Sequence, residues 1–143
     1  MFNAISVTSI FVLDQEQALD FYVRKLGFEV GSDIKNGPFR WLTVRVPGDP
    51  GHEVFLNEPG PPVMDEATAE QIRALVSKGA MSSLVLTTSD CRKAAETLKA
   101  RGVEFTQEPT DHGYGVDCGV RDPFGNAIRI LQPKHARAAA GRR

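Results

Sequence analysis

The chain has 143 residues, of which 41% are hydrophobic and 24% are charged, and its formal net charge is −1. These values are typical of a globular protein with one main core, and the near-zero charge does not favour nucleic acid or an anionic membrane as a partner. No apolar run reaches the roughly 18 residues that span a bilayer, and no signal peptide is visible, so we expect a cytoplasmic protein without nucleic-acid or membrane partners.

The first quarter of the chain predicts a strand, a helix and a second strand. Residues 5–12 are apolar and β-branched, as in a strand. Asp14 is a candidate N-cap, with Gln17 three positions later as in a capping box. Apolar residues then recur at helical spacing to Leu26, and Gly27 predicts the end of the helix. A strand is expected to start at residues 28–30.

The following segments complete a first structural unit. Residues 31–39, rich in Gly, Asn and Pro, predict a turn, and residues 40–46 alternate as in a strand. A hairpin turn at 47–51 leads to a strand at 53–57. The connector 59–80 begins with a Pro-rich stretch and contains an expected helix at 65–78, which has no counterpart elsewhere in the chain.

The remainder of the chain repeats this plan. We expect a strand at 83–88, a helix at 90–100 and a strand around 103–105, followed by a polar loop over 108–113. Strands at 114–121 and 127–131 flank a turn at 122–126. The Ala/Arg-rich tail, 137–143 in particular, is expected to be flexible.

Two matched positions define an internal repeat. Asp90 and Ala94 lie 76 residues after Asp14 and Ala18, and Gly102 corresponds to Gly27 after a slip of one residue. A repeat of this length indicates two copies of one supersecondary unit, with a pocket expected between the copies.

Each copy opens with a strand, an Asp and an amphipathic helix that ends at Leu-Gly or Arg-Gly, and the chain carries Asp-Pro-Phe-Gly-Asn at 122–126. This pattern resembles the vicinal oxygen chelate superfamily of glyoxalases, bleomycin resistance proteins and extradiol dioxygenases. The resemblance implies an α+β fold, with two tandem βαβββ units (4–58 and 81–133) in a single domain, 1–136, whose curved mixed sheet surrounds a cavity. It also implies a homodimer.

Metal-dependent members of the superfamily take two ligands from each unit, and the matching positions in this chain are poor donors. The resemblance places the ligands at Val7, at Phe55 or Glu53, at Ser83 and at Arg129. A valine offers no donor atom and an arginine repels a cation, so we expect no metal and no cofactor.

The histidines do not replace the missing ligands. His52 and His112 lie in predicted loops and His135 in the tail, without ligand spacing. A site built from Glu53, His52 and His112 is the one metal alternative left. Cys91 and Cys118 belong to no Cys-x-x-Cys pair and are expected to be reduced and structural.

Alternation along the strands places another set of residues on the cavity face. We expect the ligand-binding residues to be Val7, Ser9, Phe11, Trp41, Phe55, Asn57, Ser83, Val85 and Arg129. Apolar walls with a few polar groups are typical of a small-molecule site.

Two of the cavity residues leave alternatives open. Arg129 could grip a carboxylate or phosphate, or form an internal ion pair with Glu53 or Asp117. Trp41, near Phe39, could stack on a planar ligand, or pack in the core or at a dimer interface.

Two main functions and a third class follow, and the sequence leaves open whether the protein is an enzyme. The first is a metal-free protein, similar to bleomycin resistance proteins, that binds and sequesters a small drug or toxin. The alternative is a lyase, isomerase or dioxygenase of the glyoxalase class, with Glu53 as general base and Arg129 as oxyanion clamp. A purely structural or regulatory dimer is the third class.

Overall fold

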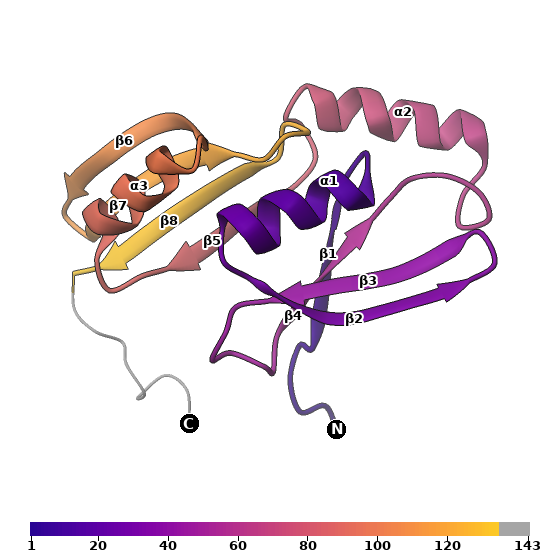
Figure 1. Ribbon diagram of the computed structural model, residues 1–143, viewed down its shortest axis with the longest axis horizontal. Helices are drawn as coiled ribbons and strands as arrows, with labels where there is room; N and C mark the ends of the chain where they lie inside the picture. The colour runs from indigo at the N-terminus through magenta and orange to yellow at the C-terminus, as the bar shows by residue number, and fades with distance from the viewer. Residues whose placement is uncertain (135–143) are drawn as a thin grey trace. The chain divides into compact units, whose positions relative to one another are not determined.

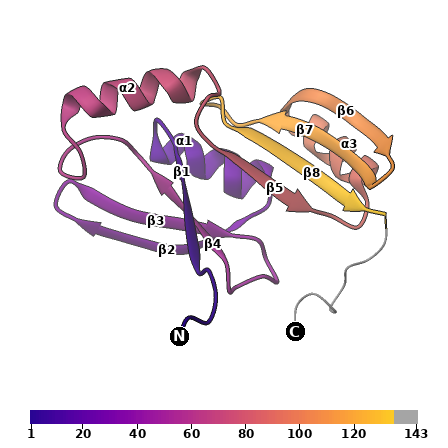
Figure 2. The ribbon, with the colours of Figure 1, turned by 180° about the vertical axis from the view of Figure 1, so that it is seen from behind.

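The computed structural model describes residues 1–134 (Figures 1 and 2). In chain order the elements are β1 (Val7–Phe11), α1 (Gln15–Leu19), the π-helical η1 (Asp20–Lys25), β2 (Glu29–Asn36), β3 (Phe39–Arg45), β4 (Glu53–Asn57), α2 (Glu66–Ser77), β5 (Ser83–Thr87), α3 (Cys91–Ala100), β6 (Glu104–His112), β7 (Gly115–Arg121) and β8 (Ala127–Pro133). Within the described residues, no helix is both long and apolar enough to cross a bilayer.

The strands form two four-stranded mixed sheets of the same topology. Their orders are β1-β4-β3-β2 and β5-β8-β7-β6. In each sheet the first and last strands of the unit pair in parallel, and the other neighbours are antiparallel. The predicted α+β fold with two tandem βαβββ units is confirmed.

The first helix of each unit begins where the sequence predicts. Asp14 accepts a hydrogen bond from the backbone N–H of Gln17 at 2.9 Å, and Asp90 accepts one from that of Lys93 at 3.0 Å. Both carboxylates are therefore N-caps. In the first unit α1 continues as the π-helical η1, whose C-cap is Leu26, and Gly27 follows with φ of +83°.

The turn expected at 31–39 is much shorter than predicted. β2 continues to Asn36, which pairs with Phe39, so the turn consists of Gly37 and Pro38. The predicted loop included Gly31, but this residue lies at an irregularity in the β2–β3 register. A glycine in a strand commonly marks such a bulge, so it did not signal a loop here.

The loop expected at 108–113 is likewise a strand. β6 runs to His112, with register shifts between Phe105 and Thr110. Pro109 is tolerated because β6 is an edge strand, where a missing N–H costs no ladder hydrogen bond. His112 therefore ends a strand and is not a loop residue.

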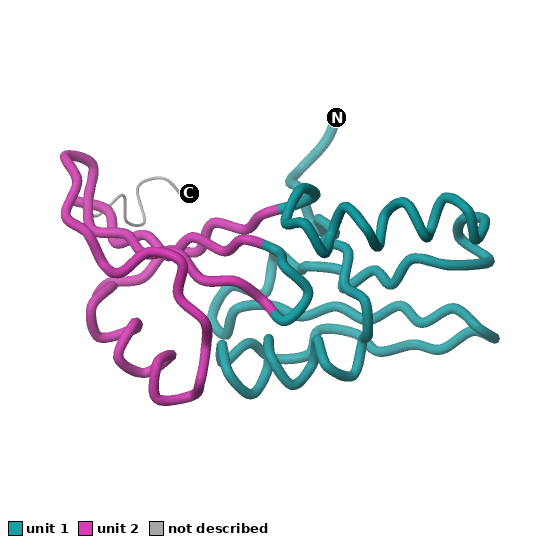
Figure 3. Tube along the Cα trace, turned by 90° about the horizontal axis from the view of Figure 1, so that it is seen from above, with its two compact units in different colours: residues 1–82, 123–126 teal, residues 83–122, 127–143 magenta. Residues whose placement is uncertain are grey.

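The chain divides into two compact units (Figure 3). Unit 1 comprises residues 1–82 together with 123–126, and unit 2 comprises 83–122 and the residues from 127 onward. Each unit contains one complete sheet and its covering helix, and α2 belongs to unit 1. The tail expected to be flexible, 137–143, and His135 lie outside the described residues.

Candidate functional site

In both units the expected binding residues lie on the sheet face opposite the buried apolar row. Ile10, Val54 and Leu56 form the buried row of unit 1. On the other face, Val7 pairs with Glu53, Ser9 with Phe55 and Phe11 with Asn57.

In unit 2, Ser83 pairs with Ala127 and Val85 with Arg129. Phe55 thus holds the register position in unit 1 that Arg129 holds in unit 2. Glu53 lies on the same face as Phe55, two residues earlier in β4.

An aromatic cluster lies on this face of unit 1. Trp41 stacks on Phe55 with ring centroids 4.4 Å apart and planes 28° from parallel. Phe39 meets the same ring edge-on at 6.1 Å. Phe55 is buried under its neighbours, whereas Trp41 and Phe39 are half-buried. The Trp41 ring is thus held in place and still keeps accessible surface.

A small pocket adjoins the aromatic cluster. Its volume is about 100 Å³, and its wall includes Phe39, Phe55, Asn57, Gln15 and the connector residues 59–63. The Gln15 amide donates to the carbonyls of Leu56, at 2.9 Å, and Arg40, at 3.2 Å. These bonds tie the start of α1 to β3 and β4. The pocket therefore combines aromatic rings with amide groups and with the charged side chains of Arg40 and Glu58.

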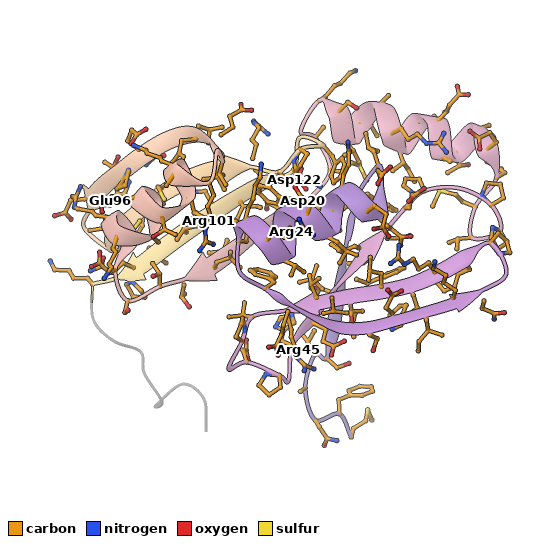
Figure 4. All side chains as sticks on the ribbon, in the orientation of Figure 1. Asp20, Arg24, Arg45, Glu96, Arg101 and Asp122 are labelled. Atoms are coloured by element: carbon orange, nitrogen blue, oxygen red, sulfur yellow. The ribbon has the colours of Figure 1, made fainter. Side chains whose placement is uncertain are left out.

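Glu53 is held in a fixed position beside the cluster. The Thr43 hydroxyl donates to Glu53 Oε1 at 2.7 Å, and Arg45, labelled in Figure 4, lies 3.4 Å from Oε2. Arg45 also donates to Glu29 at 2.8 Å. This hydrogen bond and the negative charge of Glu29 raise the pKa of Arg45. A Cβ on Gly31 would come within 2.6 Å of Glu53 Oε2, so the glycine makes room for this carboxylate.

Unit 2 carries a polar cluster centred on Asp117, which is 5% exposed. Arg129 Nη2 donates to Asp117 Oδ2 at 2.5 Å and to Gln107 Oε1 at 3.0 Å. Gln107 Nε2 donates to Asp117 Oδ1 at 3.2 Å. Burial raises the pKa of Asp117, but the hydrogen bond and charge of Arg129 outweigh it, so the pKa is lowered overall. The pair is therefore ionised at neutral pH.

Two aromatic rings complete the Asp117 cluster. His112 stacks on Tyr114 with centroids 4.9 Å apart and planes 10° from parallel. His112 Nε2 is buried and lies 3.0 Å from Asp117 Oδ1, without a hydrogen bond to it. The Tyr114 hydroxyl donates to Oδ2 at 3.3 Å, and burial together with the Asp117 charge raises the pKa of Tyr114.

The structure decides part of what the sequence left open. Of the two ion-pair partners considered for Arg129, Asp117 is the one observed, while Glu53 belongs to the hydrogen-bond network of unit 1. The sequence patterns did not identify Gln107 and His112 as members of the Asp117 cluster. In the structure, half-buried and exposed residues alternate along β6 as in a strand. The Pro-containing, polar composition of 108–113 hid this strand pattern in the sequence.

The residues at the expected metal positions do not fit a divalent ion. Of Val7, Phe55, Glu53, Ser83 and Arg129, Glu53 is the one anionic donor, and its two oxygens face Thr43 and Arg45. The guanidinium of Arg129 is a fixed cation. Among residues 1–134, no three His, Cys, Asp or Glu side chains come together as a metal site.

Two βαβββ units, each with a parallel outer pair of strands, define the class to which this protein belongs. The model of the Glyoxalase/Bleomycin resistance protein/Dioxygenase superfamily matches residues 4–130. The chain belongs to this superfamily.

Similar proteins and structures span almost the whole chain. The uncharacterized protein YurT of Bacillus subtilis (strain 168) is 37% identical, over 90% of this chain and 98% of its own. The crystal structure of UcmS2 is 39% identical, with a TM-score of 0.88 over 92% of this chain and 99% of its own. TnmS3, an antibiotic binding protein from Streptomyces sp. CB03234, is 28% identical, with a TM-score of 0.74 over 93% and 98%.

Proposed function

We propose that this protein binds a small organic molecule without a metal and sequesters it as a drug or toxin. The observation that carries the proposal is the Trp41–Phe55 stack beside the pocket of unit 1. An aromatic ring that is held in place and partly accessible is ready to stack on a planar ligand at little cost in conformational entropy. The similarity to TnmS3, an antibiotic binding protein, supports the same function.

The donor chemistry supports the metal-free part of the proposal. A cation at Arg129 and apolar side chains at Val7 and Phe55 would repel a divalent ion or fail to coordinate it. We expect the purified protein to contain almost no metal by elemental analysis, and Zn²⁺, Mn²⁺, Fe²⁺ or Ni²⁺ to leave its Tm unchanged. Stoichiometric metal, or a rise in Tm with one of these ions, would contradict this part.

The alternative is a lyase, isomerase or dioxygenase of the glyoxalase class, with Glu53 as general base and Arg129 as oxyanion clamp. Both groups already have strong partners: Glu53 accepts from Thr43 and faces Arg45, and Arg129 is paired with Asp117. A general base needs a free lone pair directed at the substrate proton, and both oxygens of Glu53 already face protein partners. These contacts favour binding over catalysis.

The single tryptophan of the chain offers a direct test of the binding site. We expect bleomycin or neutral polycyclic aromatic compounds from a screening panel to quench the fluorescence of Trp41. For a compound that does so, calorimetry should show Trp41→Ala weakening the affinity about tenfold, as expected for one lost aromatic contact. Phe2→Ala, at an aromatic residue 89% exposed and outside both sheets, should leave affinity unchanged. A bound compound that leaves the fluorescence and the Trp41→Ala affinity unaltered would place the site elsewhere.

We also propose that the protein acts as a homodimer in the cytoplasm. Val85 is 64% exposed and Ile34 is 60% exposed, and both are apolar side chains on sheet strands, where a second subunit would bury them. The two free cysteines suit a reducing compartment. Light scattering after gel filtration should give twice the chain mass of 15.6 kDa, and Val85→Glu should lower it toward one chain. A monomeric wild type would contradict the dimer.

A further inference from the structure

Cys91 and Cys118 lie side by side in the core of unit 2, although 26 residues separate them in the chain. Their Sγ atoms are 3.6 Å apart, and both side chains are fully buried. Cys91 is the first residue of α3, and Cys118 lies in the middle of β7. Each sulfur is therefore the other's neighbour in a site that excludes solvent.

The surrounding backbone holds this sulfur pair in place. The Cys91 thiol also lies 3.5 Å from the carbonyl oxygen of Ile130, and Ile130 pairs with Cys118 across the β7–β8 ladder. The Cys91 N–H donates to the Gln132 side chain at 2.9 Å, which anchors the start of α3 to β8. The Cys91 side chain at the start of α3 and the backbone of Cys118 in β7 thus both contact Ile130 of β8.

We propose that Cys91 and Cys118 form a reversible disulfide when a small hydroperoxide oxidises the protein, and that the bond joins the start of α3 to β7. A disulfide has an S–S distance of about 2.05 Å, so the sulfurs must approach each other by roughly 1.5 Å. In the proposal, rotation of the two side chains supplies this approach from their present contact. The site is separate from the aromatic cluster of unit 1 and does not depend on its function.

The reaction balances with hydrogen peroxide as the oxidant. The Cys91 sulfur, after losing its proton, attacks one peroxide oxygen, the O–O bond breaks, and the second oxygen leaves as water after taking up a proton. The Cys118 sulfur loses its proton and attacks the sulfenic sulfur of Cys91. The S–O bond breaks, and its oxygen leaves as a second water. Two thiols and one peroxide thus become one disulfide and two waters.

The positions of the two cysteines in their elements, together with the environment of Cys118, set the order of these steps. Burial, followed by the hydrogen bond between the two thiols, raises the pKa of Cys118 to about 12. The Cys118 thiol therefore stays protonated at neutral pH and is a poor first nucleophile. Cys91 is the first residue of α3, and a helix end opens more readily than the middle of a paired strand. We therefore assign the first reaction with peroxide to Cys91, and Cys118 then resolves the sulfenic acid.

The test treats the native full-length protein with hydrogen peroxide and then alkylates the remaining thiols under denaturing conditions. We expect the intact mass to fall by two hydrogens. Neither cysteine should then be alkylated, and treatment with a reductant before alkylation should restore both thiols. Trypsin without reductant should then release one cross-linked species that contains residues 79–92 and 102–121. Two thiols that persist after treatment, Cys91 oxidised to a sulfinic acid without a cross-link, or disulfides between chains would each overturn the proposal.

Single variants test the order of the steps. Cys118→Ser should accumulate a sulfenic acid at Cys91 that dimedone traps, and Cys91→Ser should lose its one thiol more slowly than the wild type. Dimedone label on Cys118 and none on Cys91 would overturn the assigned order. If either variant fails to fold, the tryptic map of the wild type still decides whether the disulfide forms.

Discussion

At the scale of single residues, Arg129 is a fixed cation inside a network and not a free clamp. Its side chain is 37% exposed, and one guanidinium nitrogen contacts both Asp117 and Gln107. A Cβ on Gly119 would come within 3.2 Å of Nη1, so the strand beside it leaves space for the planar group. The arrangement keeps a buried carboxylate paired, as a low-dielectric site requires.

Removing the cation should be costly for this reason. We expect Arg129→Met to lower the free energy of unfolding by about 2–4 kcal/mol, because Asp117 would stay buried without its charge partner. The double variant with Asp117→Leu should recover part of the loss, since it removes the unpaired charge. Urea unfolding of the wild type, both single variants and the double variant measures this coupling. Additive losses would mean that the two residues act independently.

The lowered pKa of Asp117 predicts how acid affects stability. A carboxyl whose pKa is lower in the folded state contributes stability above its unfolded pKa, and this is lost as the pH falls through the folded value. We expect the stability difference between the wild type and Asp117→Asn to shrink from roughly pH 5 to pH 3. Asp33, whose pKa is lowered by its hydrogen bond with Arg40, titrates in both proteins and cancels in the difference. A difference that does not change with pH would exclude a lowered pKa.

At the scale of elements, the β6–β7 hairpin shows how tertiary contact overrides local composition. Pro109 and the polar residues around it favour a loop, yet half-buried side chains alternate along β6 and pair with β7. The edge position accommodates the proline, and register shifts absorb the irregular spacing. The hairpin thereby carries Gln107 and His112 to Asp117.

Two glycines at the tip of this hairpin form a matched pair. Gly115 has φ +149°, and a Cβ there would lie 2.2 Å from the Gln132 carbonyl oxygen, whereas one on Gly113 would meet nothing within 4 Å. We expect Gly115→Ala to lower the free energy of unfolding by about 2 kcal/mol or more, through clash and backbone strain. Gly113→Ala should change it by less than about 0.5 kcal/mol. Chemical denaturation measures both, and equal effects would contradict the close packing of β7 on β8.

At the scale of the whole molecule, the chain leaves unit 1 and returns to it. Residues 123–126 lie in unit 1, although the strands on either side of them belong to unit 2 (Figure 3). Asn126 Nδ2 donates to the Phe11 carbonyl at 2.8 Å, and a Cβ on Gly125 would lie 2.6 Å from the Val76 carbonyl oxygen. The turn therefore packs closely on both β1 and α2.

Because residues 123–126 belong to unit 1, we expect unit 1 to be less stable without this turn. A fragment of residues 1–82 should unfold at a lower temperature than the same residues in the full chain, since it lacks the contacts of 123–126. Asn126→Ala in the full chain should lower the free energy of unfolding by about 1–2 kcal/mol, the cost of removing the hydrogen bond to the part-buried Phe11 carbonyl. Calorimetry of the fragment, the variant and the wild type checks this. A fragment as stable as the full chain would show that the turn contributes nothing.

The sequence by itself determined the repeat, the fold and the helix caps. Asp14 and Asp90 stand at equivalent positions because each caps a helix through local hydrogen bonds, and local patterns are visible in one sequence. The strand alternation likewise placed Glu53 and Phe55 on one face of β4, as the register of β1 and β4 shows, because side-chain direction repeats every two residues.

Only the tertiary structure decided which groups meet. The pairing of Arg129 with Asp117, the Trp41–Phe55 stack and the contact between Cys91 and Cys118 all join residues from different elements. Their distances depend on strand register and on the way each helix packs on its sheet. Composition can suggest that such groups exist, but register and packing bring them within reach of one another.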